Sequence, residues 1–320
     1  MKRLAIIDDW GGLVSAQPVW TRLDGRVQLD AFQDTLADEA ALVARLTPYE
    51  ILVPTRERTF FRAGLLARLP ALRMIAIGGR FTGQVDLAAA TAKAIVVTDM
   101  EGSGVHAFEH TVALLMALVR RVPQEDRATR DGRWQTPPIG VDMYGKTLGI
   151  IGLGRIGGKM AAFGRLLGMR VLATGITLTD ERAAAAGATR VDLDTLLRES
   201  DVVSVHYRLS DKTRGLITAR HLALMKPGAF LVNTARGPIV EEAALLEALR
   251  ARRIGGAALD VFDVEPLPKN HPLLSLDNVV LTPHLGFVTA EGYGIFFGQA
   301  TESILAYLDG KTPPRVVTAR

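Results

Sequence analysis

Three polar side chains in the second half of the chain have the types that a coupled transfer of a proton and a hydride requires. Arg236, Glu265 and His284 each follow a short, largely apolar run that predicts a strand. The carboxyl ends of strands in an open parallel sheet meet at one crevice. We therefore expect the three side chains to converge there.

Each of the three residues suits a distinct task. Arg236 can hold a carboxylate through two N–H groups and polarise a carbonyl. His284 can deliver a proton when hydride reaches a neighbouring carbon, and Glu265 can orient the imidazole and raise its pKa. Taken singly, each could also be a plain turn or strand-end residue. Their combination favours a catalytic set.

A glycine-rich segment precedes these residues and predicts a dinucleotide site. The sequence from Lys146 runs as a strand into the pattern G-x-G-x-x-G, followed by a helix. Gly152 permits a tight turn, Gly154 lets the backbone approach a pyrophosphate, and Gly157 allows the helix to pack closely on the strand. The amide groups at the start of the helix would then bind phosphate. The alternative is a glycine-rich packing turn.

The choice between NAD and NADP stays open. Dinucleotide folds usually place an acid about 20 residues after the glycines, where it binds the ribose hydroxyls. Here that position holds Gly175, and the nearest base is Arg182. Thr174 and Thr177 could bond either a ribose hydroxyl or a phosphate.

The hydrophobic pattern alternates strand-like runs with helical stretches, which is typical of parallel α/β sheets. It predicts five strands in a first unit, near residues 4–7, 27–29, 51–53, 74–77 and 95–97. It predicts six strands in a second unit, near 148–152, 170–173, 202–206, 229–233, 257–261 and 279–282. The predicted helices are 38–46, 62–69, 106–121, 156–167, 194–198, 242–252 and 300–308, and the third of them ends before Pro123 and a polar stretch at 124–131. The expected fold class is α/β, with two doubly wound parallel-sheet domains.

Composition limits the function classes. The 320 residues are 48% hydrophobic and 22% charged, with a net charge of +4 and no cysteine. This excludes disorder as the main state, disulfides and cysteine-based metal or nucleophile chemistry. Charge is spread evenly, so nucleic acid is not an expected partner. The longest apolar run, Val112–Val119, is too short to span a membrane, and the N-terminus has no signal-like run, so we expect a cytoplasmic protein.

Four strings together resemble the D-isomer-specific 2-hydroxyacid dehydrogenase family. They are residues 152–157, 233–237, 259–266 and 282–286, and the resemblance extends over essentially the whole chain. It implies a flavodoxin-like substrate domain made of residues 1–102 and 288–320. A Rossmann NAD(P)-binding domain, residues 103–287, is inserted between them, with a cleft between the domains and hinge helices after Gly104 and Gly286.

The resemblance also implies an activity. Members reduce a small 2-keto acid, such as glyoxylate, hydroxypyruvate or pyruvate, to a D-2-hydroxy acid with NADH or NADPH. By this resemblance Arg236 binds the substrate carboxylate, His284 is the acid/base and Glu265 its partner, in a homodimer without a metal. Formate is disfavoured because formate dehydrogenases carry Gln in place of Glu265. The alternative is a dinucleotide-sensing binding protein like the co-repressors of similar sequence.

Further site residues follow from the same resemblance. Those expected to bind the cofactor are Gly152, Gly154, Arg155, Ile156, Gly157, Thr174, His206, Thr234, Ala235, Asp260 (on the nicotinamide carboxamide) and Gly286. Those expected to bind substrate are Arg56, Arg236, and Gly78 and Gly79 through their backbone N–H groups. For Arg56 the alternative is a plain surface charge. The chain departs from the family at Gly175, at His206-Tyr207-Arg208 where His-x-Pro is usual, and in a longer loop after Gly79.

Other patterns are interpreted as structural. His106 and His110 lie one helical turn apart, but no third metal ligand is evident. Glu109 on the same helix is also interpreted as structural. The arginines at 250, 252 and 253 complement the end of a helix rather than bind nucleic acid. Four aromatic residues after His284 could line an apolar substrate pocket or pack at a hinge or subunit interface: Phe287, Tyr293, Phe296 and Phe297.

Overall fold

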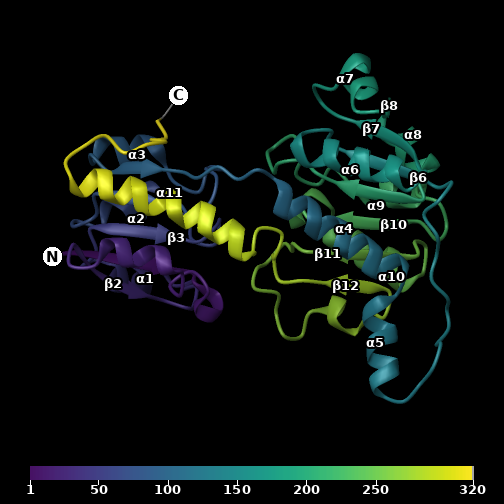
Figure 1. Ribbon diagram of the computed structural model, residues 1–320, viewed down its shortest axis with the longest axis horizontal. Helices are drawn as coiled ribbons and strands as arrows, with labels where there is room; N and C mark the ends of the chain where they lie inside the picture. The colour runs from purple at the N-terminus through teal and green to yellow at the C-terminus, as the bar shows by residue number, and fades with distance from the viewer. Residues whose placement is uncertain (319–320) are drawn as a thin grey trace. The chain divides into compact units, whose positions relative to one another are not determined.

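Short apolar runs form the parallel strands of two separate sheets in the computed structural model (Figure 1). The structure describes residues 1–318. The chain divides into a first unit, residues 1–103 with the segment from Val288 onward, and a second unit, Gly104–Phe287. The family resemblance implied a first boundary one residue earlier. Both units are α/β with parallel sheets, as expected.

The first unit has a five-stranded sheet in the order β2-β1-β3-β4-β5, which is the flavodoxin-like order. Its strands are β1 (Lys2–Ile7), β2 (Val27–Ala31), β3 (Ile51–Pro54), β4 (Met74–Ala76) and β5 (Val96–Thr98). Its helices are η1 (Trp10–Gly12), η2 (Pro18–Leu23), α1 (Glu39–Leu46), α2 (Ala63–Ala67), α3 (Leu87–Ala92) and α11 (Ala290–Leu308). Figure 1 shows α11, in yellow, crossing this sheet, so the end of the chain returns to the first unit.

The second unit has a seven-stranded sheet in the order β12-β11-β10-β9-β6-β7-β8. Its strands are β6 (Thr147–Ile151), β7 (Arg170–Thr174), β8 (Thr189–Arg190), β9 (Val202–Val205), β10 (Phe230–Asn233), β11 (Gly256–Leu259) and β12 (Val279–Leu281). Its helices are α4 (Val105–Val119), α5 (Val122–Arg130), α6 (Arg155–Leu166), α7 (Asp180–Ala185), α8 (Leu193–Glu199), α9 (Ala219–Leu224), η3 (Gly237–Ile239), α10 (Glu242–Arg250) and η4 (Pro272–Ser275). The strand order reverses between β6 and β9, which is where such sheets bind ligands.

Several elements differ from the sequence prediction, and the short helices α3, α7 and α9 were not among those predicted. The strand β8 was not predicted because it has two residues, one of them charged and both exposed. The helix α5 includes most of the polar stretch at 124–131, where no helix was predicted; a proline sits in its first turn, and Arg130 pairs with Asp126 one turn earlier. The sequence did not reveal this helix because it is exposed to solvent and carries no apolar stripe.

The helix α11 begins ten residues earlier than predicted, at Ala290. The hydroxyl oxygen of Thr289 caps it by accepting a hydrogen bond from the N–H of Gly292 at 2.9 Å. Three glycines in its first half dilute the apolar pattern that would otherwise reveal it. Within residues 1–318, no helix combines the length and apolar content that crossing a membrane demands.

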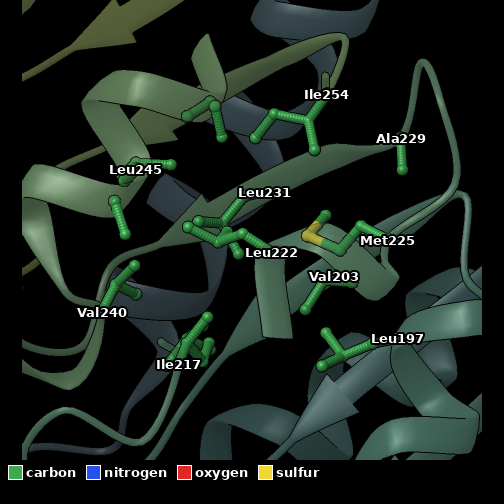
Figure 2. Packing of buried hydrophobic residues seen from close by; sticks show 14 of the residues in the cluster. Leu197, Val203, Ile217, Leu222, Met225, Ala229, Leu231, Val240, Leu245 and Ile254 are labelled. Atoms are coloured by element: carbon green, nitrogen blue, oxygen red, sulfur yellow. The ribbon is translucent and has the colours of Figure 1, made fainter. Parts of the chain in front are cut away.

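The seven-stranded sheet is buried on both faces. Figure 2 shows one face, where Val203 and Leu231 pack against Leu222 and Leu245 of the covering helices. On the other face, α4 and α6 contribute a second apolar cluster. Close packing on both sides fixes the strand ends. Those ends carry the polar residues described next.

Candidate active site

The turn after β6 has the geometry that the glycine pattern predicts. Gly152 has a φ of +100°, and a Cβ placed on it would lie 3.0 Å from the carbonyl carbon of His206. A Cβ on Gly157 would lie 2.3 Å from the carbonyl oxygen of Gly152, so only glycine fits at either position. No heavy atom outside its chain neighbours and its own helix lies within 4 Å of a Cβ placed on Gly154, so there is open space at this position. The turn is a cradle that fits the pyrophosphate of a dinucleotide.

The residues that follow the turn complete this cradle. The helix α6 begins at Arg155, so its first N–H groups face the turn. The side chains of Arg155 and Ile156 lie against Gly104, within 3.2 and 3.4 Å of a Cβ placed there. Thr174 ends β7, which pairs with β6. The structure thus places these expected cofactor residues around one strand end.

His206 follows β9 and is uncharged at neutral pH. Burial lowers its pKa to about 4, and its Nε2 lies 2.8 Å from the hydroxyl of Ser204. Its backbone lies against Gly152. The backbone of His206 therefore supports the glycine turn, while its neutral ring contacts Ser204.

Arg236 lies on a braced loop after β10. The buried side chain of Asn233 donates to the carbonyl oxygen of Arg236 and accepts from the N–H of Ala235, both at 3.0 Å. The hydroxyls of Thr234 and Thr111 lie 2.7 Å apart, which ties the loop to α4. Arg236 Nη1 donates to the carbonyl of Ala235 at 2.6 Å. These contacts brace the loop backbone and hold the guanidinium against the carbonyl of Ala235.

Glu265 and His284 form a close pair. Glu265 Oε2 lies 2.6 Å from His284 Nδ1, while Oε1 accepts the N–H of Phe262 at 3.0 Å. His284 is 8% exposed, and its ring stands edge-to-face on Phe287 at 5.9 Å. Because Nδ1 donates to the carboxylate, Nε2 is the nitrogen left for chemistry. The φ of His284 is +57°, a left-handed conformation that the surrounding contacts must maintain.

A second buried carboxylate, Asp260, organises the loop that carries His284. Its Oδ1 accepts the N–H of Leu285 at 2.7 Å and the hydroxyl of Thr282 at 2.6 Å, and Oδ2 accepts the N–H of Gly286 at 2.8 Å. His110 Nε2 lies 3.1 Å from Oδ1 and 2.9 Å from the Thr282 hydroxyl. Burial raises the pKa of Asp260, but these hydrogen bonds outweigh it and keep the carboxyl ionised.

The strand order places the three predicted catalytic residues after neighbouring strands. They follow β10, β11 and β12, which are neighbours in the sheet. Gly237, directly after Arg236, approaches the backbone of Phe262 so closely that a Cβ would lie 2.1 Å from its carbonyl carbon. The loop of Arg236 therefore packs against the loop of Glu265.

Four contributing residues were not singled out for this site from the sequence: His110, Thr111, Asn233 and Thr282. His110 was considered only as half of a metal pair, and the structure places it on Asp260. Within the described part of the chain, no three His, Asp or Glu side chains are grouped to hold a metal. The sequence did offer one signal for two of these residues, because Thr282 and Asn233 lie at the ends of predicted strands. Which helix residues face them depends on tertiary packing.

The first unit brings together its own expected substrate residues. Arg56 follows β3 with a φ of +68°, and its Nη1 lies 3.2 Å from a Cβ placed on Gly79. Its guanidinium lies over the ring of Phe296 at 5.8 Å. The N–H groups of Gly78 and Gly79 already donate within the unit, to Pro54 and Ile77 at 2.8 and 2.7 Å. Both amides are engaged within the unit, and their expected contact with a substrate carboxylate stays a prediction.

The four aromatic residues have different surroundings. Phe297 is fully buried and contacts the rings of Tyr293 and Trp20 at 5.2 and 5.7 Å, so it belongs to the core of the first unit. Phe296 lies under Arg56. Phe287 lies against His284 in the second unit. Two of the four therefore border predicted site residues.

Comparison with known proteins agrees with this arrangement. Residues 112–286 match the family model described as "D-isomer specific 2-hydroxyacid dehydrogenase, NAD binding domain". The glyoxylate reductase of Aeropyrum pernix is 42% identical over 262 residues, covering 79% of this chain and 78% of that protein. The D-3-phosphoglycerate dehydrogenase of Archaeoglobus fulgidus is 41% identical over 252 residues, covering 78% of this chain. The chain spans about half (48%) of that relative's length.

Solved structures give the same result. A phosphoglycerate oxidoreductase from Vibrio cholerae superimposes with a TM-score of 0.91 at 36% identity, covering 97% of this chain and all of that one. The apo form of D-lactate dehydrogenase from Escherichia coli gives a TM-score of 0.85 at 27% identity, covering 99% and 100% of the two chains. The family model matches more than half of the chain, and a relative is 42% identical over 79% of it. The chain therefore belongs to the D-isomer-specific 2-hydroxyacid dehydrogenase family.

Proposed function

We propose that this protein is an NAD(P)-dependent oxidoreductase that interconverts a small 2-keto acid and the corresponding D-2-hydroxy acid. The observation that carries the proposal is the Glu265–His284 pair, 2.6 Å apart at the strand ends of the sheet that also holds the glycine turn. A proton-transfer pair and a dinucleotide cradle on one sheet edge are the two parts that reversible hydride transfer requires. Family membership supports the same reaction.

The residues around the cradle have defined tasks in this proposal. The turn of Gly152, Gly154 and Gly157 would hold the pyrophosphate, and Asp260 would meet the nicotinamide carboxamide. The reduced nicotinamide supplies the hydride when it is bound. Asp260 Oδ2 accepts one hydrogen bond in the structure, from Gly286, so it retains acceptor capacity for an amide donor.

Proton transfer falls to His284. Its Nε2 gives a proton to the substrate oxygen during reduction and takes it back during oxidation. Glu265 accepts the Nδ1 hydrogen and stabilises the imidazolium when the ring is protonated. Its other oxygen is fixed by the N–H of Phe262, so the imidazole is held in one orientation.

Substrate recognition falls to two arginines. Arg236 offers a bidentate pairing with a carboxylate and polarises the neighbouring carbonyl, which lowers the barrier to hydride attack. In the first unit, Arg56 is the cation assigned to substrate, and Gly79 leaves room for its guanidinium. Among glyoxylate, hydroxypyruvate and pyruvate, glyoxylate is the first candidate, because a glyoxylate reductase is among the most similar relatives.

The test is a panel of 2-keto acids, including a phosphorylated one, with NADH and NADPH in parallel. Loss of reduced-nicotinamide absorbance with at least one acid supports the proposal. Cofactor binding without turnover of any acid contradicts it. That outcome would favour a dinucleotide-sensing binding protein of the same fold.

We also propose that the protein is a cytoplasmic homodimer. Trp134, Ile139 and Val122 are 80%, 89% and 55% exposed in and after α5, and burying these apolar side chains against a second copy would be favourable. The neighbouring α5 carries both Glu125 and Arg127, so the surface can pair with a copy of itself. Sedimentation of the wild type and of a Trp134→Ser, Ile139→Ser double variant tests this. A monomeric wild type overturns the proposal.

A further inference from the structure

The turn that follows β7 has an arrangement that bears on which dinucleotide the protein binds. Sheets of this type usually place a carboxylate here, where it accepts hydrogen bonds from the adenosine ribose. In this chain the position is Gly175, and the backbone turns back so that the N–H of Leu178 donates to the carbonyl of Gly175 at 3.1 Å. A Cβ on Gly175 would lie 2.8 Å from the Cβ of the buried Leu178. The turn as built has no room for an acidic side chain.

A cation is held at the tip of the same turn. Arg182, in the first turns of α7, folds back and donates from Nη1 to the carbonyl of Thr177 at 2.8 Å. Thr179 fixes the start of the helix by accepting the N–H of Arg182 at 3.3 Å. A guanidinium has five N–H donors, so one bond to a carbonyl leaves it able to bind an anion.

A phenol adds a donor from the neighbouring loop. The hydroxyl of Tyr207 accepts the N–H of Ile176 at 2.7 Å, so its own hydrogen is directed away from that amide. Burial raises the pKa of Tyr207, which keeps the hydroxyl protonated. The turn between Thr174 and Thr177 therefore combines a cation, a phenol donor and threonine hydroxyls without a carboxylate of its own.

The acids of α7 are already engaged. Asp180 pairs with Arg190 at 3.4 Å. Hydrogen bonds with its own backbone amide and with Thr179 lower the pKa of Glu181. The charges of Asp180 and Arg190 offset one another. The remaining cation at the turn, Arg182, is bound to an uncharged carbonyl.

We propose that this turn binds the 2′-phosphate of NADPH in preference to the free ribose hydroxyl of NADH, with Arg182 as the residue that recognises the phosphate. The inference rests on the proposed dinucleotide function but concerns its adenosine end alone. A ribose hydroxyl finds no carboxylate acceptor in the turn, whereas a phosphate finds the guanidinium and the Tyr207 hydroxyl. Charge-assisted hydrogen bonds of this kind are worth about tenfold or more in affinity.

The test measures binding of the adenosine end without any turnover. Isothermal titration compares adenosine 2′,5′-bisphosphate with adenosine 5′-monophosphate on the intact protein. We expect the bisphosphate to bind about tenfold tighter or more. Arg182→Ala should abolish that preference and leave binding of the monophosphate unchanged. Arg182→Lys should retain part of it, because lysine keeps the charge but loses the planar fork.

Arg198→Ala is the matched control. Arg198 is an exposed arginine on α8 that pairs with Asp194 at 3.6 Å, and its removal changes the net charge equally. It should leave the preference unchanged. Equal affinities in the wild type, failure of both nucleotides to bind, or a preference that survives Arg182→Ala would each overturn the inference. A bisphosphate preference without turnover of any keto acid would retain it while contradicting the proposed reaction.

Discussion

Each of the two parallel sheets buries an aspartate just after a strand, and the two aspartates have different surroundings. Asp8 follows β1 in the first unit, Asp260 follows β11 in the second, and both are 1% exposed. Asp260 accepts hydrogen bonds from two backbone amides and a hydroxyl, and a histidine ring lies within bonding distance. Asp8 accepts the hydroxyl of Thr35 at 2.6 Å, with a further hydrogen bond from Thr59.

This difference moves the pKa values of the two carboxyls in opposite directions. Burial raises the pKa of Asp8, and its hydroxyl partners only partly offset the effect. Burial also raises the pKa of Asp260, but its more numerous donors outweigh burial and lower the pKa overall. The same place in the same kind of sheet can therefore stabilise a negative charge or penalise it. The surroundings of Asp260 in the second unit therefore favour the charged carboxyl, whereas burial in the first unit disfavours the charged form of Asp8.

The largest expected effect comes from removing the proton donor in the second unit. His284→Ala should lower kcat by about 10²- to 10⁴-fold, because general acid/base catalysis contributes that much. Titration should show that adenosine nucleotides still bind, since the glycine turn is unaffected. His271→Gln is the control, because His271 pairs with Glu242 at 3.1 Å on a different loop. Near-normal turnover by His284→Ala would remove this residue from the mechanism.

The next effect tests the fixed charge directly. Asp260→Asn should lower the free energy of unfolding by about 2–3 kcal/mol, because the amide cannot accept all the hydrogen bonds that the carboxylate receives. The pKa of Asp260 is lowered in the fold, so its stabilisation is present above the unfolded-state value and is lost as pH falls through the folded-state value. Urea unfolding at neutral and acidic pH should show the deficit shrinking in acid. A deficit that is constant with pH would contradict the assignment of charge.

Much of the fold could be predicted from the sequence because the strands are short, continuous apolar runs. All five strands of the first unit and six of the seven in the second were predicted within a few residues. The exceptions have physical reasons. The strand β8 is polar and two residues long, α5 is a solvated helix without an apolar face, and glycines hide the start of α11. Periodicity cannot detect elements whose stability comes from caps, charges or neighbours.

The site could be predicted only in part. Strand-end positions pointed to Arg236, Glu265 and His284, and the structure places them after three adjacent strands. The sequence could not show that His110 on α4 meets Asp260, because that contact joins residues 150 positions apart. Nor could it show that Arg182 folds back on its own turn, which depends on a helix start fixed by Thr179. Side-chain direction at a loop is decided by packing, which one sequence does not reveal.

A smaller effect should follow from the cation of the first unit. Arg56→Ala should raise KM for the keto acid by about tenfold, the value of one charge-assisted hydrogen bond, and change kcat much less. Steady-state kinetics separate the two parameters. Arg62→Ala is the control, because Arg62 stacks on Phe60 and donates to the carbonyl of Gly83. An equal change for both variants would mean that Arg56 acts only as a surface charge.

The smallest effect has the opposite sign to that of Asp260. Asp8→Asn should raise the free energy of unfolding at neutral pH by about 1 kcal/mol or less, because the amide oxygen still accepts the Thr35 hydroxyl and no buried charge remains. The pKa of Asp8 is raised in the fold, so the wild type is penalised above the folded-state value and recovers as pH falls towards the unfolded-state value.

Urea unfolding should therefore show the advantage of Asp8→Asn disappearing in acid. Asp8→Ala is its control and should be destabilised at both pH values, because the hydroxyls of Thr35 and Thr59 lose their acceptor. If Asp8→Asn instead behaves like Asp260→Asn, losing stability at neutral pH and regaining it in acid, both sheets stabilise a charged aspartate. The two buried carboxyls would then be alike, and the contrast drawn here between Asp8 and Asp260 would be wrong.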